Sequence, residues 1–317
     1  MANAWRKNPG LHWTWKLLLL TFPLTLLLLF VLLLRRPVPS FVQTQTLVLK
    51  SLPQFGPIRP LDCLRYPTAT PIFANVVEGL RFPFIYSLAD LGIPDKPHRN
   101  ILRMMKGKPF RKPDISSKVQ EILGKVDRKD GIFVDVGANV GMATFAAAAM
   151  GFKVFAFEPV VENLQRLCDG VFLNRVGDAV TLFAAAASDQ IGNITFHKLV
   201  GRLDNSAISA SGAKLTFKSN QEIAVEVMSV PLDSVIPDSQ PVVLLKIDVQ
   251  GWEYHVLRGA VKLLSRKGNE APYLIYEEDE RLLAASNSSS KEIREFLASV
   301  GYNQCTQHGN DAHCQKG

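Results

Sequence analysis

Cysteine and internal repetition are what this chain has least of. Four cysteines among 317 residues are too few for a small domain that disulfides hold together. No segment of about 20–50 residues recurs, which argues against a solenoid or a propeller. Hydrophobic residues make up 47% of the chain, so it is too apolar for a disordered protein and can bury a sizeable core. The composition therefore predicts one large or two small globular domains.

One long apolar run stands near the N-terminus. Residues 17–34 read LLLLTFPLTLLLLFVLLL, which is 18 residues without a charge. A helix of that length spans about 27 Å, enough for a thin hydrocarbon core. A cleaved signal peptide is the alternative, but its apolar region is usually shorter, about 7–15 residues, and no A-x-A-like site follows here. We interpret residues 17–34 as a transmembrane anchor behind a short N-terminal tail, residues 1–16.

The orientation of this anchor depends on weaker signals. Basic residues flank both ends of the run, so the positive-inside rule nearly ties. Two glycosylation sequons, Asn193-Ile-Thr195 and Asn287-Ser-Ser289, favour a lumenal body. A short, Leu-rich span suits the thinner membranes of the early secretory pathway. We expect a single-pass type II membrane protein of the Golgi or endoplasmic reticulum, which contacts the lipid bilayer through residues 17–34.

Proline and basic residues mark the next part of the chain. We interpret the Pro-rich residues 35–60 as a stem, and residues 61–114 as a basic flanking segment packed on the core. Residues 96–129 carry 11 Lys and Arg against 3 Asp and Glu. Such a patch suits an anionic substrate or a membrane surface, and a solvated face is the alternative. Without interleaved aromatic residues or a DNA-reading motif, it predicts no nucleic-acid partner.

The remainder, residues 115–317, alternates apolar strands with helices. Strands are predicted at 132–136, 153–157, 179–187, 242–249 and 273–278. Helices are predicted at 117–126, 140–150, 160–169, 252–264 and 291–300. The segments 194–200 and 223–230 bracket a polar insert. Strands that are apolar throughout belong to a parallel sheet covered on both faces, so the fold class is a doubly wound, mostly parallel α/β domain.

A glycine-containing loop is the clearest sign of a ligand site. The segment from Asp135 to Gly141, DVGANVG, follows a strand and opens a helix, where small residues let the backbone approach a ligand closely. Glu158 ends the next strand, and a carboxylate there can accept both hydroxyl hydrogens of a ribose. The dinucleotide fingerprint G-x-G-x-x-G is absent, which disfavours an NAD or nucleotide-sugar enzyme. Asp135 instead suits a ligand with a cationic end.

Three segments resemble a known family. FVDVGANVGMATFAAAAMGFKVFAFEP (133–159), LLKIDVQGWEYHVLRGA (244–260) and PYLIYEE (272–278) are similar to signatures of FkbM-type methyltransferases. The resemblance covers about residues 115–310. It implies a class I, Rossmann-like fold and S-adenosyl-L-methionine as the cofactor. It also implies methyl transfer, commonly to oxygen on sugars or polyketides.

The resemblance assigns roles to single residues. The cofactor-binding positions that it implies are Asp135, Gly137, Asn139, Gly141, Glu158 and Asp189, the last facing the adenine edge. Asp248 faces the methyl-transfer region and is our candidate catalytic base, because a base near the accepting oxygen is what the protein can supply. Glu253 also matches the family, with a chemical or a structural role. Gln250 departs from the family's usual Glu, which puts a base at that position in doubt.

Three further sets of residues each allow two interpretations of their role. His255 is a base by type, but it lies one turn into a helix, which favours packing. The acidic run 277–280 offers oxygen ligands for a divalent ion, although a solvated loop is the preferred reading, so no metal is assigned. Cys305 and Cys314 flank a turn and suit a disulfide across a hairpin, with zinc as the alternative. Cys63 and Cys168 are interpreted as separate, unpaired residues.

Two functions of different classes remain. The first is a membrane-anchored, S-adenosylmethionine-dependent O-methyltransferase for a hydroxyl of a glycan or small glycoside. The second is a catalytically idle binding module with the same fold, which the Gln250 departure supports. The sequence identifies neither the acceptor nor the oligomeric state.

Overall fold

The computed structural model describes most of the chain beyond the stem. The described residues are 56–63, 66, 74–77, 79–88, 92–93, 96–97, 99–108, 114–128, 130–199, 206–208 and 222–317. Contacts divide the chain into Met1–Pro53, which lies outside the described residues, and a compact unit of Gln54–Gly317. The predicted transmembrane segment, residues 17–34, therefore falls outside the described part. Within that part, no helix is long and apolar enough to cross a membrane.

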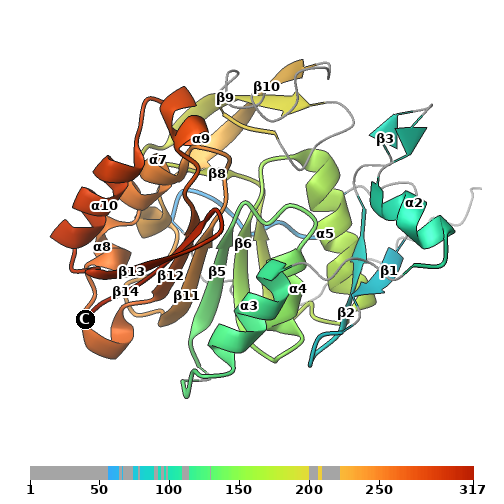
Figure 1. Cartoon of the computed structure of the whole chain (residues 1–317), viewed down its shortest axis with the longest axis horizontal. Helices are drawn as coiled ribbons and strands as arrows, with labels where there is room; N and C mark the ends of the chain where they lie inside the picture. Colours follow the sequence, from blue (N-terminus) through green and yellow to red (C-terminus); the bar gives the residue numbers. More distant parts are fainter. Residues whose placement is uncertain are drawn as a thin grey trace, which may run out of the picture. The chain divides into compact units, whose positions relative to one another are not determined.

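A seven-stranded sheet forms the centre of the molecule (Figure 1). Its strand order is β13-β14-β12-β11-β5-β6-β7. The strands are β5 (Ile132–Val136), β6 (Lys153–Phe157), β7 (Val180–Phe183), β11 (Val242–Ile247), β12 (Tyr273–Glu277), β13 (Gln304–His308) and β14 (Asp311–Gln315). The five strands from β12 to β7 are parallel, whereas β14 runs antiparallel to both β12 and β13. The mostly parallel, Rossmann-like sheet that the sequence predicts is confirmed.

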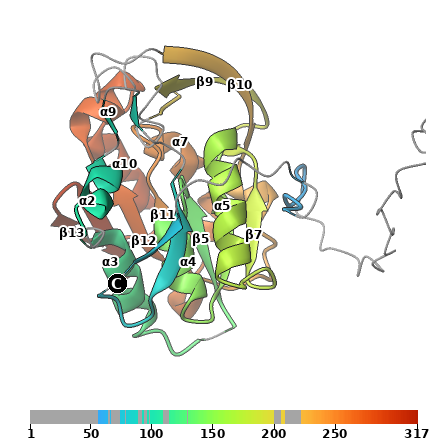
Figure 2. The same cartoon turned by 90° about the vertical axis from the view of Figure 1, so that its right-hand side faces the viewer.

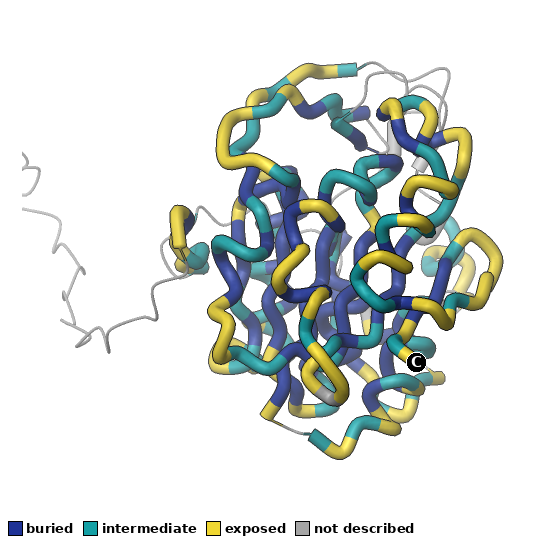
Figure 3. Tube along the Cα trace, turned by 90° about the vertical axis from the view of Figure 1, so that its left-hand side faces the viewer, coloured by how far each residue is buried: buried dark blue, intermediate teal, exposed yellow. Residues whose placement is uncertain are grey.

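Helices cover both faces of this sheet (Figure 2). The helices of one face are α3 (Asp114–Leu123), α4 (Met142–Ala148) and α5 (Val161–Leu173). Those of the other face are α7 (Glu253–Arg258), α8 (Val261–Leu264), α9 (Glu280–Ala285) and α10 (Ser290–Ser299). In β5, Ile132 and Val134 pack toward α7 and α8, while Phe133 packs toward α3 and α4. Both faces of β5 are thus buried, which explains why four of its five residues are apolar (Figure 3).

A flanking layer precedes the α/β core. It consists of β1 (Ala74–Val77), β2 (Phe84–Ser87), β3 (Gly92–Ile93), β4 (Lys96–Pro97) and α2 (Arg99–Met105). Strand β2 lies against α5, where the Asn174 side chain accepts from Ile85 N–H at 2.7 Å and donates to the Ile85 carbonyl at 2.6 Å. Arg166, almost fully buried, donates to the Ser87 hydroxyl at 3.2 Å.

The segments that bracket the polar insert form a separate small sheet. It contains β8 (Ala186–Ala187), β9 (Gly192–Leu199) and β10 (Glu222–Val230), in the order β8-β10-β9. Figure 1 shows β9 and β10 beyond the end of the central sheet at which the ligand site was predicted. Lys198 on β9 forms an ion pair of 2.8 Å with Glu162 on α5, which ties the insert to the core.

Two predicted elements are divided in the structure. The segment 179–187 forms β7 of the central sheet and then β8 of the insert sheet, so it is not one strand. The segment 252–264 forms α7 and α8, which meet at Gly259. A side chain at Gly259 would place its Cβ 1.9 Å from the Ser188 carbonyl oxygen. The Asp233 carboxylate caps the new helix by accepting from Lys262 N–H at 2.8 Å and Leu263 N–H at 3.0 Å.

The cysteines pair more fully than predicted. Cys305 and Cys314 form a disulfide across the β13–β14 hairpin, one of the two readings of that pair, so zinc is not bound by these thiols. Cys63 also forms a disulfide with Cys168 on α5, and our prediction that these two stay separate was wrong. Sequence spacing did not indicate this bond because 105 positions separate the partners, and only the docking of the flanking segment on α5 brings them together.

Candidate active site

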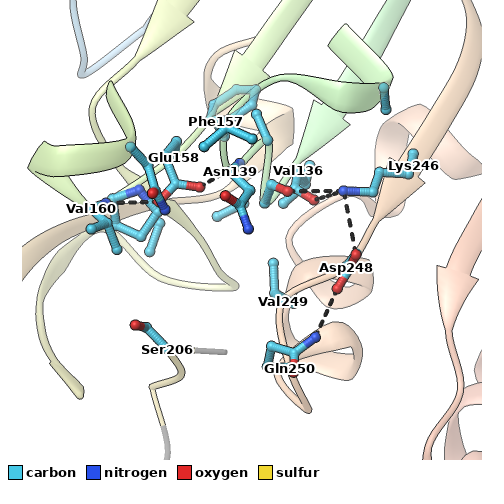
Figure 4. Close-up of a pocket in the computed structure, with 18 of the residues that line it drawn as sticks. Val136, Asn139, Phe157, Glu158, Val160, Ser206, Lys246, Asp248, Val249 and Gln250 are labelled. Carbon is cyan, nitrogen blue, oxygen red and sulfur yellow. Dashed lines mark hydrogen bonds and ion pairs between the residues drawn. The ribbon is translucent and has the colours of Figure 1, made fainter. Parts of the chain in front are cut away.

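A cavity of about 280 Å³ opens at the carboxyl ends of β5, β6 and β11. That volume lies near the lower end of the usual range for small-molecule sites, roughly 300–1,000 Å³. Most of its lining comes from four segments: 136–143 without Gly141, 157–160, 185–187 and 246–250 without Ile247. Figure 4 shows Glu158 and Asp248 on opposite sides of it, with Asn139 between them. The structure thus brings the two predicted motifs together around one space.

The predicted glycine loop lines one wall of the cavity. Its backbone is left-handed at Gly137, Asn139 and Gly141, with φ angles of 75°, 53° and 92°. The N–H groups of Gly137 and Ala138 both donate to the Phe157 carbonyl at 3.0 Å. A Cβ on Gly137 would lie 1.9 Å from the Asp248 carbonyl oxygen, so this glycine is required by the protein itself. Gly141 is outside the lining, and its missing side chain makes room for the Phe145 ring.

Asp135 lies beneath this loop and does not line the cavity. Its side chain is fully buried, 3.1 Å from the Lys246 ammonium, and accepts from the Thr144 hydroxyl at 2.6 Å. Lys246 does line the cavity and donates to the Gly137 carbonyl at 2.9 Å. Asp135 therefore organises the loop, but its charge is matched by Lys246 and is not presented to the cationic end of a ligand, although the sequence had predicted that it would be.

Lys246 was missed by sequence reasoning. It is the one charged residue inside the apolar run VVLLKI of β11, and that isolation could have drawn attention to it. Burial lowers the pKa of Lys246, but the carboxylates of Asp135 and Asp248 outweigh burial and raise it overall. Lys246 consequently stays charged and joins the glycine loop to the end of β11.

Glu158 also lines the cavity and is only 4% exposed. Its Oε2 accepts from Asn139 N–H at 2.8 Å. Its Oε1 accepts from Val160 N–H at 2.9 Å and from the Asn163 side-chain amide at 3.2 Å. Burial raises the pKa of Glu158, and these donors act against that rise by stabilising the carboxylate.

Asn163, on the first turn of α5, also lines the cavity and was not predicted. It is 2% exposed, and its Oδ1 has no hydrogen-bond partner among the described residues. A buried amide oxygen without a donor costs free energy, on the order of 1–3 kcal/mol. An oxygen of this kind in a cavity wall suits a ligand that brings a hydroxyl or an amine.

Asp189 is not brought to the cavity. Its Oδ2 lies 3.6 Å from both His255 Nδ1 and Arg258 Nη2 on α7, and it is outside the lining. The division of segment 179–187 explains this, because the chain after β8 turns toward α7. His255 itself stacks on Trp252 with ring centroids 3.8 Å apart, in keeping with the packing role favoured for it. We therefore no longer place Asp189 beside the adenine.

Asp248 stands at the mouth of the cavity with a side chain 46% exposed. Its Oδ1 accepts from Gln250 Nε2 at 3.0 Å, and its Oδ2 lies 3.7 Å from Lys246 Nζ. The same Gln250 amide nitrogen donates to Glu277 Oε2 at 2.9 Å. Gln250 thus bridges two carboxyl groups by donating to both, which an ionised Glu at this position could not do.

Glu253 lies behind this turn and does not line the cavity. Its Oε1 accepts from Val249 N–H at 2.9 Å and from Gly251 N–H at 3.2 Å, so it clamps the backbone on both sides of Gln250. Gln250 has a φ of 55°, a left-handed conformation that costs energy for a residue with a side chain. Of the two roles left open for Glu253, this geometry supports the structural one.

Each of the four acidic side chains in the run 277–280 contacts a different part of the protein. Glu277 accepts from Gln250, and burial together with Asp248 and Glu253 raises its pKa to about 9. Glu278 pairs with Arg294 at 2.7 Å, Asp279 caps α9, and Glu280 accepts from Ser290 N–H at 2.9 Å. No group of three or more side chains suited to a metal ion occurs in the described part of the chain.

Residues outside the predicted motifs close the cavity. Tyr86 and Leu88 come from the flanking layer, whereas Phe196, Ser206 and Ile208 come from the insert. Sequence reasoning missed them because nothing local distinguishes them from ordinary core residues. Their position depends on how two peripheral layers dock on the central sheet.

Comparisons with known proteins bear on the identity of this domain. The model of the methyltransferase FkbM domain matches residues 135–303. No curated protein matches the chain. Among solved structures, a precorrin-6y C5,15-methyltransferase from Geobacter metallireducens is similar at 14% identity and a TM-score of 0.37, over 65% of this chain and 89% of that one. A SAM-dependent methyltransferase from Agrobacterium tumefaciens is similar at 10% identity and a TM-score of 0.37, over 74% of this chain and 61% of that one.

The family match includes both motifs that line the cavity. It begins at Asp135, ahead of the glycine loop, and continues past Asp248 and β12. The fold, the loop and the cavity agree with the class of domain that the family match describes. Because residues 135–303 are more than half of the 317 residues, the chain belongs to the FkbM methyltransferase domain family.

Proposed function

We propose that this protein is a membrane-anchored, S-adenosylmethionine-dependent O-methyltransferase that acts on a hydroxyl of a glycan or small glycoside. The observation that carries this proposal is the cavity itself, in a domain of a methyltransferase family. It has a glycine loop and Glu158 on one side and a half-exposed carboxylate, Asp248, at its mouth.

The cavity fits the cofactor. Glu158 and Asn163 offer acceptors for hydroxyl groups, and Phe157 with Ala185–Ala187 offers apolar surface for a planar base. The loop from Gly137 to Asn139 would hold the amino-acid end close to its backbone. When bound, S-adenosylmethionine supplies a methyl group on a positively charged sulfur.

The contribution of the chain to the reaction centres on Asp248. Its carboxylate accepts the proton of the acceptor hydroxyl, which makes that oxygen a better nucleophile. Gln250 and Lys246 hold the carboxylate from two sides, so it faces the acceptor in a fixed position. Positioning of this kind supplies much of the rate of a bimolecular transfer. The oxygen acceptor follows from the base, and the carbohydrate from the family resemblance.

Features of the described chain support a lumenal body. All four cysteines are in disulfides, which persist in oxidising compartments. Asn193 and Asn287, the sequon residues, are both exposed. We therefore propose a type II arrangement in the Golgi or endoplasmic reticulum, with residues 17–34 as the anchor.

Calorimetry and radiolabelled methyl transfer test the enzymatic proposal. The full chain should bind S-adenosylmethionine and label one of the glycoprotein, glycolipid or cell-wall fractions. Asp248→Asn should lower kcat by about 10²–10⁴ with cofactor affinity little changed, whereas Asp238→Asn, an exposed control, should match the wild type. Binding without any transfer would identify an idle binding module. No binding would overturn the proposal.

Glycosidase treatment tests the topology. A lumenal body should shift in mobility on treatment, and Asn287→Gln should reduce that shift. Protease added outside sealed microsomes should leave the body intact. Complete digestion under those conditions would refute the type II arrangement.

A further inference from the structure

The hydrogen-bonding capacity of Glu158 is nearly used up by the protein. An ionised carboxylate offers about four lone-pair positions, two on each oxygen. Both positions on Oε1 are occupied, by Val160 N–H and by the Asn163 amide. One position on Oε2 is occupied by Asn139 N–H, which leaves one (Figure 4). Glu158 therefore has room for one further donor and cannot take both hydroxyls of a ribose, as the sequence had led us to expect.

A ribose has two hydroxyls, and Glu158 has room for only one of them. An acceptor for the second hydroxyl lies next to Glu158. Asn163 Oδ1 is buried, lines the cavity and has no partner among the described residues. Its orientation follows from chemistry. A carboxylate can only accept, so the NH₂ group of Asn163 must face Glu158, and the carbonyl oxygen must point elsewhere.

We infer that Glu158 and Asn163 share the two ribose hydroxyls of the bound nucleoside, one donating to Glu158 Oε2 and the other to Asn163 Oδ1. This assignment rests on the proposed function and deepens it, because it makes Asn163 a second binding residue for a vicinal diol. The two acceptors are adjacent, because the Asn163 amide that donates to Glu158 Oε1 also carries the second acceptor oxygen. Asn139 N–H and Val160 N–H hold Glu158 independently of Asn163, so the two contributions can be separated.

The sharing predicts that both hydroxyls matter, each through a different residue. S-Adenosylhomocysteine and its 2′-deoxy and 3′-deoxy forms are the probes, and calorimetry on the full chain is the measurement. The wild type should bind each deoxy form about five- to tenfold more weakly, the effect of one hydrogen bond. This comparison needs no variant, so it does not depend on how any variant folds.

Variants at Asn163 then identify the partner hydroxyl. Asn163→Leu should weaken binding of S-adenosylhomocysteine and of one deoxy form by at least about fivefold. It should have no further effect on the other deoxy form, which lacks the hydroxyl that Asn163 would accept. Asn163→Ala should give the same pattern, and thermal melting checks that both variants fold. Gln165→Leu is the matched control, an amide on the same helix that does not line the cavity.

Three results would overturn the inference. The first is a wild type that binds either deoxy form as tightly as the parent compound. The second is an Asn163 variant that loses the same factor on all three ligands, which indicates a purely structural role. The third is an Asn163 variant that binds all three like the wild type. A wild type that binds none of the probes would instead remove the proposed function, so the two failures are distinguishable.

Discussion

Gly137 shows how a single position can be fixed by the protein and not by its ligand. A Cβ there would lie 1.9 Å from the Asp248 carbonyl oxygen, in a backbone with a φ of 75°. The ends of β5 and β11, two of the three strands at the cavity, meet at this contact. A side chain at this position would therefore separate the glycine loop from the turn that begins at Asp248.

Gly137→Ala should consequently destabilise the fold. Gly151 has a φ of 86°, but nothing lies within 4 Å of where its Cβ would be, so Gly151→Ala incurs only the backbone strain, about 1–2 kcal/mol. Gly137→Ala adds the clash to that strain, so we expect a loss of at least about 3 kcal/mol. Urea unfolding of the two variants measures the difference. Equal losses would contradict the close approach of the two strand ends.

Glu253 makes stability depend on pH. Burial raises its pKa from an ordinary 4.5 to about 7, so the folded state holds a proton that the unfolded chain has already released. Its contribution is complete below about pH 4.5 and is lost as the pH rises through about 7.

The unfolding free energy should therefore fall as the pH rises over this range, and fall less in Glu253→Gln. The remaining slope in that variant includes Glu277, whose pKa is also raised. Glu295→Gln, on an exposed part of α10, should keep the wild-type slope. Chemical unfolding at a series of pH values gives the comparison, and identical slopes in Glu253→Gln and wild type would contradict a buried, proton-holding Glu253.

The site residues that the sequence predicted stand in recognisable motifs, whereas the position of those it missed depends on tertiary packing. Asn139, Glu158 and Asp248 stand at strand ends within motifs, and the sequence places them at one edge of the sheet. Asn163 lies outside the three motif segments, and Lys246 lies within one of them as part of an apolar strand, so their roles appear only when strands and helices are packed together. Asp189 was misplaced because the predicted strand 179–187 is divided into β7 and β8, and the Asp189 side chain then lies toward α7.

At the scale of elements, α5 carries more of the architecture than its length suggests. It places Asn163 in the cavity, receives the insert through Glu162, and holds β2 through Asn174. The sequence predicts this helix over 160–169, while the structure extends it to Leu173. The extra turn brings Asn174 to β2, and the docking of a distant strand could not be read from local periodicity.

Asn174→Leu should test this docking. The variant loses an acceptor for Ile85 N–H at 2.7 Å and a donor for the Ile85 carbonyl at 2.6 Å. Two such bonds at a partly buried site are worth about 2–3 kcal/mol. Urea unfolding measures the loss, and hydrogen exchange at the Ile85 amide should accelerate. Asn303→Leu, an exposed position ahead of β13, should have little effect.

At the scale of the whole molecule, the two disulfides differ in how much chain they close. Cys63–Cys168 spans 105 positions, whereas Cys305–Cys314 spans 9. In the chain-entropy description, the stabilisation grows with the logarithm of the loop length.

Replacing Cys63 and Cys168 by Ser should therefore cost about 5 kcal/mol, and replacing Cys305 and Cys314 about 2.5 kcal/mol. Unfolding of both double variants under the same conditions gives the difference. A larger loss for the hairpin pair would show that the docked flanking segment is not held by its crosslink.

The longer crosslink also determines how the protein carries a mechanical load. When the chain is pulled from its two ends, tension enters at Cys63 and crosses the sulfur bridge to α5. The strands β1, β2, β5 and β6 and helices α2 to α4 lie inside the closed ring, so the covalent path between the two ends of the chain does not run through them. The ring also withholds 105 residues of contour length, roughly 350 Å, until the bond is reduced. Force along the covalent chain would thus bypass the glycine loop.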